Sequence, residues 1–271
     1  MINLEFLSGF KYVNGIYRDE SVIQNTYFDK LYYELRNREG RNFSDQDLKK
    51  LPSLPDVNSL ASEFQIRKGS ANRLILYLKS IQTSPLSILE IGCGNGWLSN
   101  MLCTIPGSKV FGIDTVRSEI EQAARVFPAE NLFFIYADVN NLNFATQEFD
   151  IVIFSASIQY FPGISNLVTK ISKSLKPNGE IHFLESPVYQ ENEIENAKAG
   201  SKSYYSKMGF APLSDFYFHH TESDFRKLNA DWLFTPTFLK NKLQILFPRL
   251  GYSPFPWLRI RKSSLKGEKS T

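Results

Sequence analysis

Short apolar runs alternate with amphipathic stretches through the middle of the chain, between about residues 70 and 186. Apolar runs bounded by turn residues are typical of buried strands, and apolar residues spaced by three or four are typical of helices. The predicted strands are 88–91, 110–113, 132–136, 150–154 and 180–184. The predicted helices are 71–81, 97–104, 116–127 and 165–175. This alternation indicates an α/β fold, with a parallel sheet covered on both faces.

The flanking regions follow other patterns. Helical spacing of apolar residues between 22 and 38 predicts a helix in an otherwise polar and aromatic N-terminal segment. Thr221 has the sequence context of a helix start, and 232–235 and 256–260 predict two further strands. The predicted organisation is a helical segment or cap, the α/β core, a lid insertion, the C-terminal part of the core and a basic tail, over residues 1–69, 70–186, 187–220, 221–262 and 263–271.

Prolines lie next to two of the predicted strands. Lys176-Pro177-Asn178-Gly179 predicts a tight stop before the strand at 180–184. Pro254 and Pro256 restrict the last predicted strand to an edge of the sheet, or place a proline at its start, because proline has no backbone donor.

The composition is that of an ordinary folded domain, with 42% hydrophobic and 22% charged residues and an aromatic share of 14%. No apolar run approaches the ~20 residues of a membrane helix, and residues 1–6 lack the features of a signal peptide. Two cysteines cannot form a disulfide framework. We therefore expect a reducing, cytoplasmic location and no membrane partner.

The net charge of +3 comes from the end of the chain. Residues 259–271 hold five basic residues and one acidic residue, which leaves 26 basic and 27 acidic residues elsewhere. The body is neutral and the basic excess is predicted to be a tail. A nucleic-acid partner is therefore disfavoured, although an RNA- or DNA-directed enzyme that uses this tail stays open.

A glycine-rich turn, Gly92-Cys93-Gly94-Asn95-Gly96, joins the first predicted strand of the core to the helix that follows. Glycine permits positive φ and a close approach of the backbone to a ligand. The spacing G-x-G-x-G differs from the dinucleotide pattern G-x-G-x-x-G. Glu90, two residues before the turn, suits a cofactor that carries positive charge better than a pyrophosphate.

Two more carboxylates stand at strand ends. Asp114 lies 22 positions after Gly92, where an acidic residue accepts hydrogen bonds from ribose hydroxyls, and Asp138 ends the next strand. Three acidic strand ends around one glycine loop predict a single cofactor site. The alternatives are a strand-end cap for Asp114, a turn-forming role for Asp138, glycines that only form the turn, and a small buried filler for Cys93.

Together, Glu90-x-Gly92-x-Gly94-x-Gly96, Asp114, Asp138-Val139, 149–152 and 175–179 resemble the small-molecule branch of the class I S-adenosylmethionine-dependent methyltransferase family. The resemblance covers about residues 70–186. It implies a Rossmann-like, doubly wound sheet of seven strands whose last strand is antiparallel. The implied cofactor is S-adenosyl-L-methionine, with S-adenosyl-L-homocysteine as its product.

The resemblance also implies roles for individual residues. Gly92 and Gly94 would lie against the methionine part of the cofactor, and Glu90 close to its ammonium. Asp114 would hold the ribose hydroxyls, and Asp138 the adenine amino group. The implied cofactor-binding set is Glu90, Gly92, Cys93, Gly94, Asn95, Asp114, Thr115, Asp138, Val139 and Ser155.

Methyl transfer from a sulfonium is an in-line displacement, in which orientation alone can supply ~7–11 kcal/mol. The chemistry needs no metal, and no residue cluster has the spacing of metal ligands. Candidate catalytic groups are His219 and His220, at the end of the lid insertion, and Tyr160. A surface role for the two histidines and core packing for Tyr160 are the alternatives, and His182 is predicted to be structural.

The expected acceptor is an oxygen or nitrogen of a small organic molecule held between residues 1–69 and 187–220. A Pro-Pro-aromatic motif, typical of methylation of DNA base amines, is absent after 150–154. Tyr189, Tyr204 and Tyr205 either line an aromatic acceptor pocket or pack the lid. A non-catalytic protein that binds S-adenosylmethionine is a further alternative, and the sequence leaves the oligomeric state open.

Overall fold

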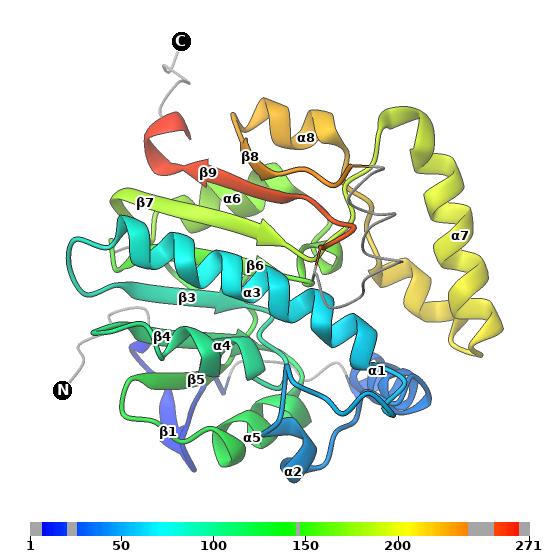
Figure 1. Ribbon diagram of the computed structural model, residues 1–271, viewed down its shortest axis with the longest axis horizontal. Helices are drawn as coiled ribbons and strands as arrows, with labels where there is room; N and C mark the ends of the chain where they lie inside the picture. Colours follow the sequence, from blue (N-terminus) through cyan, green and yellow to red (C-terminus); the bar gives the residue numbers. More distant parts are fainter. Residues whose placement is uncertain (1–6, 21–25, 145–146, 238–251, 266–271) are drawn as a thin grey trace.

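The computed structural model describes residues 7–20, 26–144, 147–237 and 252–265, which form a sheet with helices on both faces (Figure 1). The strand order is β1-β2-β5-β4-β3-β6-β7-β9-β8. The strands are β1 (Lys11–Val13), β2 (Ile16–Arg18), β3 (Ser87–Ile91), β4 (Lys109–Asp114), β5 (Leu132–Tyr136), β6 (Phe149–Ser155), β7 (Leu175–Leu184), β8 (Asp231–Phe234) and β9 (Trp257–Arg261). The Rossmann-like α/β class predicted from the sequence is confirmed.

Neighbouring residues of a strand point to opposite faces of the sheet, so each face presents apolar side chains and is covered by its own helices. Ile88 belongs to the core beneath α3, α4 and α5, whereas Leu89 belongs to the core beneath α6 and α8. The helices are α1 (Thr26–Arg38), α2 (Asp45–Leu48), α3 (Ala61–Ile81), α4 (Trp97–Leu102), α5 (Arg117–Val126), α6 (Ile164–Ser172), α7 (Ile194–Lys207) and α8 (Glu222–Lys227). In the described residues, none of these helices has the length and apolar character needed to span a membrane.

The last strand in the chain runs against its neighbours. β9 is antiparallel to both β7 and β8, whereas β5, β4, β3, β6 and β7 pair in parallel. It lies inside the sheet rather than at an edge, and Pro256 directly precedes it. The predicted antiparallel last strand is confirmed, and of the two places allowed for the proline the strand start is the one found.

The sheet has nine strands rather than the seven expected. The additional pair is a hairpin, β1 and β2, within the segment predicted to be helical. Its turn is Asn14-Gly15, with φ of 52° and 82°, which is the conformation that an Asn-Gly hairpin turn requires. β2 then pairs in parallel with β5 and buries Ile16, which is 1% exposed. The hairpin covers the edge that β5 would otherwise present.

The predicted tight stop at 176–179 is also corrected. These residues belong to β7, which begins at Leu175 opposite Phe149 and shifts its register before Glu180 pairs with Ile151. Leu175 is fully buried, and Lys176 forms an ion pair with Asp150 at 2.7 Å. The strand therefore begins at Leu175, which is already part of the core, and runs through the shift in register without stopping at 176–179.

The 187–220 segment is helical and packs with α1 beyond the carboxyl ends of the strands (Figure 1). It holds α7 and a short 3-10 helix, η4 (Ala211–Phe216). Leu35 of α1 forms a separate hydrophobic cluster with Tyr205, Phe210 and Leu213. Two segments far apart in the sequence thus form one packed unit, which we call the α1–α7 unit.

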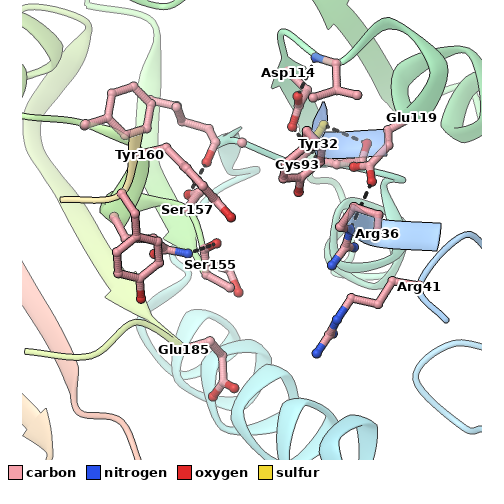
Figure 2. Close-up of a pocket in the computed structure, with 18 of the residues that line it drawn as sticks. Tyr32, Arg36, Arg41, Cys93, Asp114, Glu119, Ser155, Ser157, Tyr160 and Glu185 are labelled. Carbon is pink, nitrogen blue, oxygen red and sulfur yellow. Dashed lines mark hydrogen bonds and ion pairs between the residues drawn. The ribbon is translucent and has the colours of Figure 1, made fainter. Parts of the chain in front are cut away.

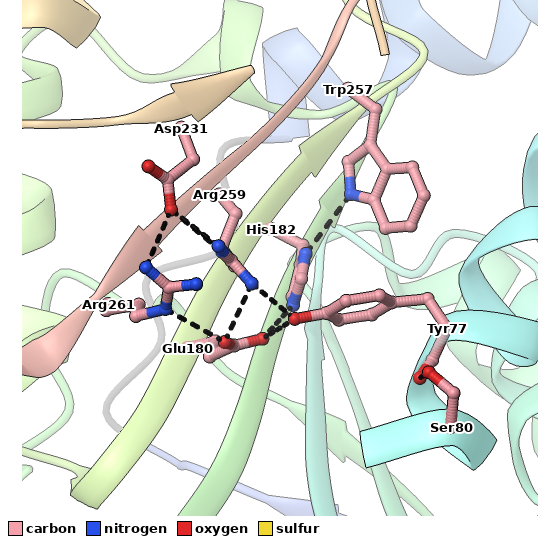
Figure 3. A network of polar contacts seen from close by, with 8 residues as sticks. All are labelled: Tyr77, Ser80, Glu180, His182, Asp231, Trp257, Arg259 and Arg261. Atoms are coloured by element: carbon pink, nitrogen blue, oxygen red, sulfur yellow. Dashed lines mark hydrogen bonds and ion pairs between the residues drawn. The ribbon is translucent and has the colours of Figure 1, made fainter. Parts of the chain in front are cut away.

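A buried polar network fastens β9 to its neighbours (Figure 3). Arg259, 8% exposed, donates to Glu180 at 3.2 Å and to Asp231 at 2.6 Å. Tyr77 of α3 donates to Glu180 at 2.8 Å. Trp257 donates its indole N–H to His182 Nδ1 at 3.1 Å, so the predicted structural role of His182 agrees with its contacts.

This network shows that some of the basic residues predicted to form a tail belong to the sheet. Arg259 and Arg261 are strand residues, and both form ion pairs with Glu180 and Asp231. Residues 262–265 form a 3-10 turn, and Lys266 and Lys269 lie outside the described residues. Part of the charge assigned to a tail therefore belongs to the sheet, where acidic residues neutralise it.

Candidate functional site

A cavity of about 1180 Å³ opens at the carboxyl ends of β3, β4, β5 and β6, which is where open α/β sheets bind ligands. Its walls are the glycine loop, the residues that follow these strands, and residues of α1, α3 and α7. Figure 2 shows the loop, the strand ends and the α1 side chains Tyr32 and Arg36. A site for one small molecule usually measures about 300–1,000 Å³. The cavity therefore has room for two ligands side by side.

The glycine loop is held against the end of β4. The N–H groups of Gly92 and Cys93 both donate to the carbonyl of Ile113, at 2.9 and 3.0 Å. Gly92, Gly94 and Gly96 all have positive φ. A Cβ on Gly96 would lie 2.7 Å from the ring of Phe134, so this glycine is also required by packing. The three glycines can therefore form the turn and also allow a cofactor to approach the backbone.

Glu90 lies beneath the loop with 2% of its surface exposed. Ser99 of α4 donates a hydrogen bond to its carboxyl at 2.5 Å. Burial, reinforced by the nearby Asp114 carboxylate, raises the pKa of Glu90 to about 8. Glu90 therefore keeps its proton more readily than an exposed glutamate does.

Asp114 joins the loop to the end of β4. One carboxylate oxygen accepts the N–H of Gly94 at 2.7 Å, and the other accepts the N–H of Val116 at 2.8 Å. Burial and the neighbouring Glu119 raise the pKa of Asp114 to about 6, against the effect of these hydrogen bonds. The side chain is thus fixed in place, and the strand-end cap expected as an alternative is part of its role.

The remaining predicted cofactor residues all line the cavity: Cys93, Asn95, Thr115, Asp138, Val139 and Ser155. Asp138 also accepts the N–H of Asn140 at 2.8 Å, which is the turn-forming contact expected as its alternative. Burial raises the pKa of the Cys93 thiol well above its usual value, so it remains a neutral, small side chain. The structure therefore brings the whole predicted set together around one space.

The two adjacent histidines do not face this space. His220 is 4% exposed and donates from Nε2 to the carbonyl of Ile158 at 3.0 Å. His219 is hydrogen-bonded to Ser201 of α7 at 2.9 Å. Neither is among the lining residues in the described part of the chain. The expectation that one of them lies over the transferred methyl group is corrected, because both side chains tie the end of the 187–220 segment to its neighbours.

Tyr160 does line the cavity, within a cluster of aromatic rings. Its ring is edge-on to Tyr32 of α1 at 6.1 Å and to Tyr217 at 6.3 Å between centroids. Burial raises the pKa of Tyr160, so its hydroxyl stays protonated at neutral pH and can donate a hydrogen bond. Tyr189, Tyr204 and Tyr205 also line the cavity.

Several cavity residues were not predicted. Asp29, Tyr32 and Arg36 line it from one face of α1. Glu39, which follows that helix, and Glu185, which follows β7, line it as well. The spacing of three or four between the α1 residues could have indicated a shared face. No local signal places that face over the glycine loop. Among the described residues, no group of acidic, histidine or cysteine side chains has the geometry of a metal site.

Comparison with known proteins identifies the central part of the chain. Residues 88–179 match the family model described as a methyltransferase domain. The chain is 31% identical over 120 residues to a malonyl-[acyl-carrier protein] O-methyltransferase of Priestia megaterium, which covers 44% of this chain and 43% of the relative. It is 29% identical over 173 residues to a protein of the same name from Acetivibrio thermocellus, covering 64% and 53%. The chain spans about half the length of the curated relatives it matches.

Solved structures agree in fold. Magnesium protoporphyrin IX methyltransferase from Synechocystis, with S-adenosylhomocysteine bound, matches with a TM-score of 0.51 and 18% identity, covering 90% of this chain and 99% of that one. An S-adenosylmethionine-dependent methyltransferase from Mesorhizobium loti matches with a TM-score of 0.52 and 19% identity, covering 72% and 99%. Residues 88–179 are thus similar to a methyltransferase domain, and the sheet with its helices has the fold of the solved S-adenosylmethionine-dependent methyltransferases.

Proposed function

We propose that this protein transfers a methyl group from S-adenosylmethionine to an oxygen or nitrogen of a small organic molecule by in-line displacement. The observation that carries the proposal is the arrangement of Glu90, Asp114 and Asp138 around the glycine loop, in a cavity with space for a second ligand. The aromatic α1–α7 unit, which bounds that second space, supports an organic acceptor.

The cofactor would lie along the ends of β3, β4 and β5. Glu90 would face its ammonium, and Asp114 would accept hydrogen bonds from its ribose hydroxyls. Asp138 and Val139 would flank the adenine, and Ser155 would lie near the methionine end. The raised pKa values of Glu90 and Asp114 support this assignment, because a cationic ligand relieves the cost of ionising both buried carboxyls.

The bound cofactor supplies a methyl group on a positively charged sulfur, which is already reactive toward a nucleophile. The protein's task is to hold the acceptor in line with that group and to exclude water. Tyr32, Tyr160 and Tyr217 form part of the aromatic wall suited to that task. The protonated Tyr160 hydroxyl would position an acceptor by donating a hydrogen bond to it.

We propose the acceptor from the residues that line this chain's cavity and not from the names of its relatives. The names of the first relatives specify O-methyl transfer to malonyl-[acyl-carrier protein]. The match to the family model, however, spans residues 88–179 and leaves out both α1 and α7. Those are the elements that bound the proposed acceptor space, so they decide the acceptor independently of the shared core.

Calorimetric titration with S-adenosylhomocysteine tests the cofactor half of the proposal. We expect saturable 1:1 binding by the wild type and a loss of affinity of at least about tenfold for Asp114→Ala, because a hydrogen bond to a charged group contributes ~1.5–3 kcal/mol. Asp215→Ala is the matched control, since Asp215 is exposed and does not line the cavity.

Absence of binding by the wild type, or equal binding by wild type and Asp114→Ala, would overturn the assignment. Transfer of a labelled methyl group from S-adenosylmethionine into the small-molecule fraction of a cell extract tests the second half. Label found only in RNA or DNA would favour the nucleic-acid alternative instead. Binding without transfer into any fraction would favour a non-catalytic role.

A further inference from the structure

A carboxyl group that the sequence did not single out lies in the wall of the cavity. Glu185 directly follows β7, is 8% exposed and lines the cavity (Figure 2). Its Oε1 atom is buried and accepts no hydrogen bond from any residue that the structure describes. The backbone at Glu185 has a φ of 56°, an uncommon conformation for a residue with a side chain. Buried carboxyls ordinarily have partners, so this one is placed to receive a group that is not part of the protein.

The other charges around the cavity do not neutralise Glu185. Arg36 pairs with Glu119 at 3.6 Å, and Arg41 with Glu63 at 2.5 Å. Arg67 also pairs with Glu63, at 2.8 Å. Arg41 also pairs with Glu39 at 3.0 Å, so the three arginines that line the cavity are matched by three glutamates.

Arg73 interacts electrostatically with Glu185 and also contacts neutral groups. The Glu185 carboxylate acts to raise the pKa of Arg73, although burial has the larger effect and lowers it. Arg73 donates a hydrogen bond to Ser70 at 2.9 Å and lies over the ring of Phe234. Arg73 therefore interacts with Glu185 through charge, while the Oε1 atom of Glu185 has no hydrogen-bond partner among the described residues.

Glu185 borders the space expected for the acceptor. The carbonyl of Leu184 accepts the N–H of Ala156 at 2.9 Å, which places Glu185 beside the end of β6. Aromatic side chains form much of the remaining wall: Phe28, Tyr32, Tyr160, Tyr205, Phe216 and Tyr217. A carboxylate oxygen with no hydrogen-bond partner in the described residues and a cavity wall of aromatic faces both attract an organic cation.

We propose that Glu185 binds the acceptor, and that the acceptor is a small aromatic molecule with a basic nitrogen such as an amine or a guanidine. The carboxylate would accept an N–H of that group while the aromatic rings pack against the rest of the molecule. This inference rests on the proposed function, because it assigns the second ligand of the methyltransferase cavity.

The test uses three probes that share an aromatic body and differ in charge: tyramine, 4-ethylphenol and 3-(4-hydroxyphenyl)propionate. Each is titrated into the 271-residue chain saturated with S-adenosylhomocysteine, up to about 10 mM, above the ~1 mM Kd of a weak ligand. We expect tyramine to bind at least about tenfold more tightly than the neutral probe, and the anionic probe to bind most weakly. In Glu185→Gln, which keeps the shape of the side chain, the preference for tyramine should disappear.

Glu195→Gln is the control, because Glu195 is an exposed residue of α7 outside the cavity lining. It should keep the preference of the wild type. The proposal is overturned if tyramine fails to bind, if the anion binds best, or if Glu185→Gln retains the preference. S-adenosylhomocysteine is titrated into each variant first. Its failure to bind the wild type contradicts the proposed function, whereas normal binding with no preference for tyramine contradicts only the role of Glu185.

Discussion

Individual residues in the site have properties that the fold imposes on them. Glu90 and Asp114 are ordinary acids in the sequence, yet burial raises the pKa of the first to about 8 and of the second to about 6. Cys93, in the middle of the glycine loop, is kept neutral by the same effect. Perturbed acids in a cavity are typical of functional sites, because the protein accepts a cost in the free state that a ligand relieves.

Glu90→Gln is expected to melt at a higher temperature than the wild type, and the difference should grow as the pH rises from 5 to 8. The unfolded carboxyl ionises near its usual pKa of about 4.3, whereas the folded one keeps its proton to about pH 8. Unfolding therefore releases a proton in this range, and the stability of the wild type falls as the pH rises. Glutamine does not ionise, so its folded state is not destabilised as the pH rises. We expect its advantage in melting temperature over the wild type to be on the order of 5 °C larger at pH 8 than at pH 5.

Thermal unfolding of both proteins, followed by circular dichroism at several pH values, measures this difference. Glu195→Gln, an exposed change of the same kind, should show no such trend. A gain for Glu90→Gln that stays constant or shrinks toward pH 8 would contradict the buried, protonated state of Glu90. The same variant should bind S-adenosylhomocysteine more weakly, which would separate stability from binding.

At the scale of elements, the additions to the core determine what the cavity can hold. The Asn14-Gly15 hairpin extends the sheet at one edge, and α1 packs with α7 over the carboxyl ends of the strands. At the other edge, β9 inserts between β7 and β8 and is fixed by the network around Arg259 (Figure 3). Each element depends on a partner that is distant in the sequence.

Arg259→Ala is expected to lower the free energy of unfolding by about 3 kcal/mol, because it removes the buried cation of Glu180 and leaves only the half-exposed Arg261, 3.6 Å away. Arg226→Ala is the matched control. Its ion pair with Glu222 joins two residues of α8, and the Arg226 side chain is 70% exposed, so the loss should be below about 0.5 kcal/mol. Urea denaturation measures both values, and equal losses would show that the network does not hold β9 in the sheet.

The whole molecule combines a weakly positive net charge with an acidic cavity. The net charge is +3, but Arg259 and Arg261 are paired within the sheet and do not form a basic surface. The carboxyls of Glu90, Asp114, Asp138 and Glu185 all face the cavity. This distribution favours a cationic ligand inside and gives little attraction for a polyanion among the described residues.

We expect no saturable binding of a fluorescently labelled single-stranded RNA at ~0.15 M salt, even at the ~100 µM protein concentrations that reveal non-specific nucleic-acid binding. Fluorescence anisotropy provides the measurement, with the chain lacking residues 263–271 as the comparison. Micromolar binding that weakens steeply with salt and disappears with this deletion would instead support the nucleic-acid alternative.

The antiparallel last strand was implied by the resemblance to the methyltransferase family. The sequence by itself determined the α/β core and the grouping of the glycine loop with its acidic strand ends. These depend on local signals: apolar runs, the glycine loop, and acids at strand ends that the parallel topology must bring to one edge. The N-terminal hairpin also had a local signal in Asn14-Gly15, which the helical reading of that segment overlooked.

Only the tertiary structure decided the acceptor side. His219 and His220 had chemistry suited to catalysis, yet packing directs them to Ser201 and to the Ile158 carbonyl. Glu185 had no motif at all, and it is singled out only because its buried Oε1 atom has no hydrogen-bond partner in the part of the chain that the structure describes. Where a side chain points, and whether its charge is already matched, depends on contacts between distant segments, which spacing along one chain does not encode.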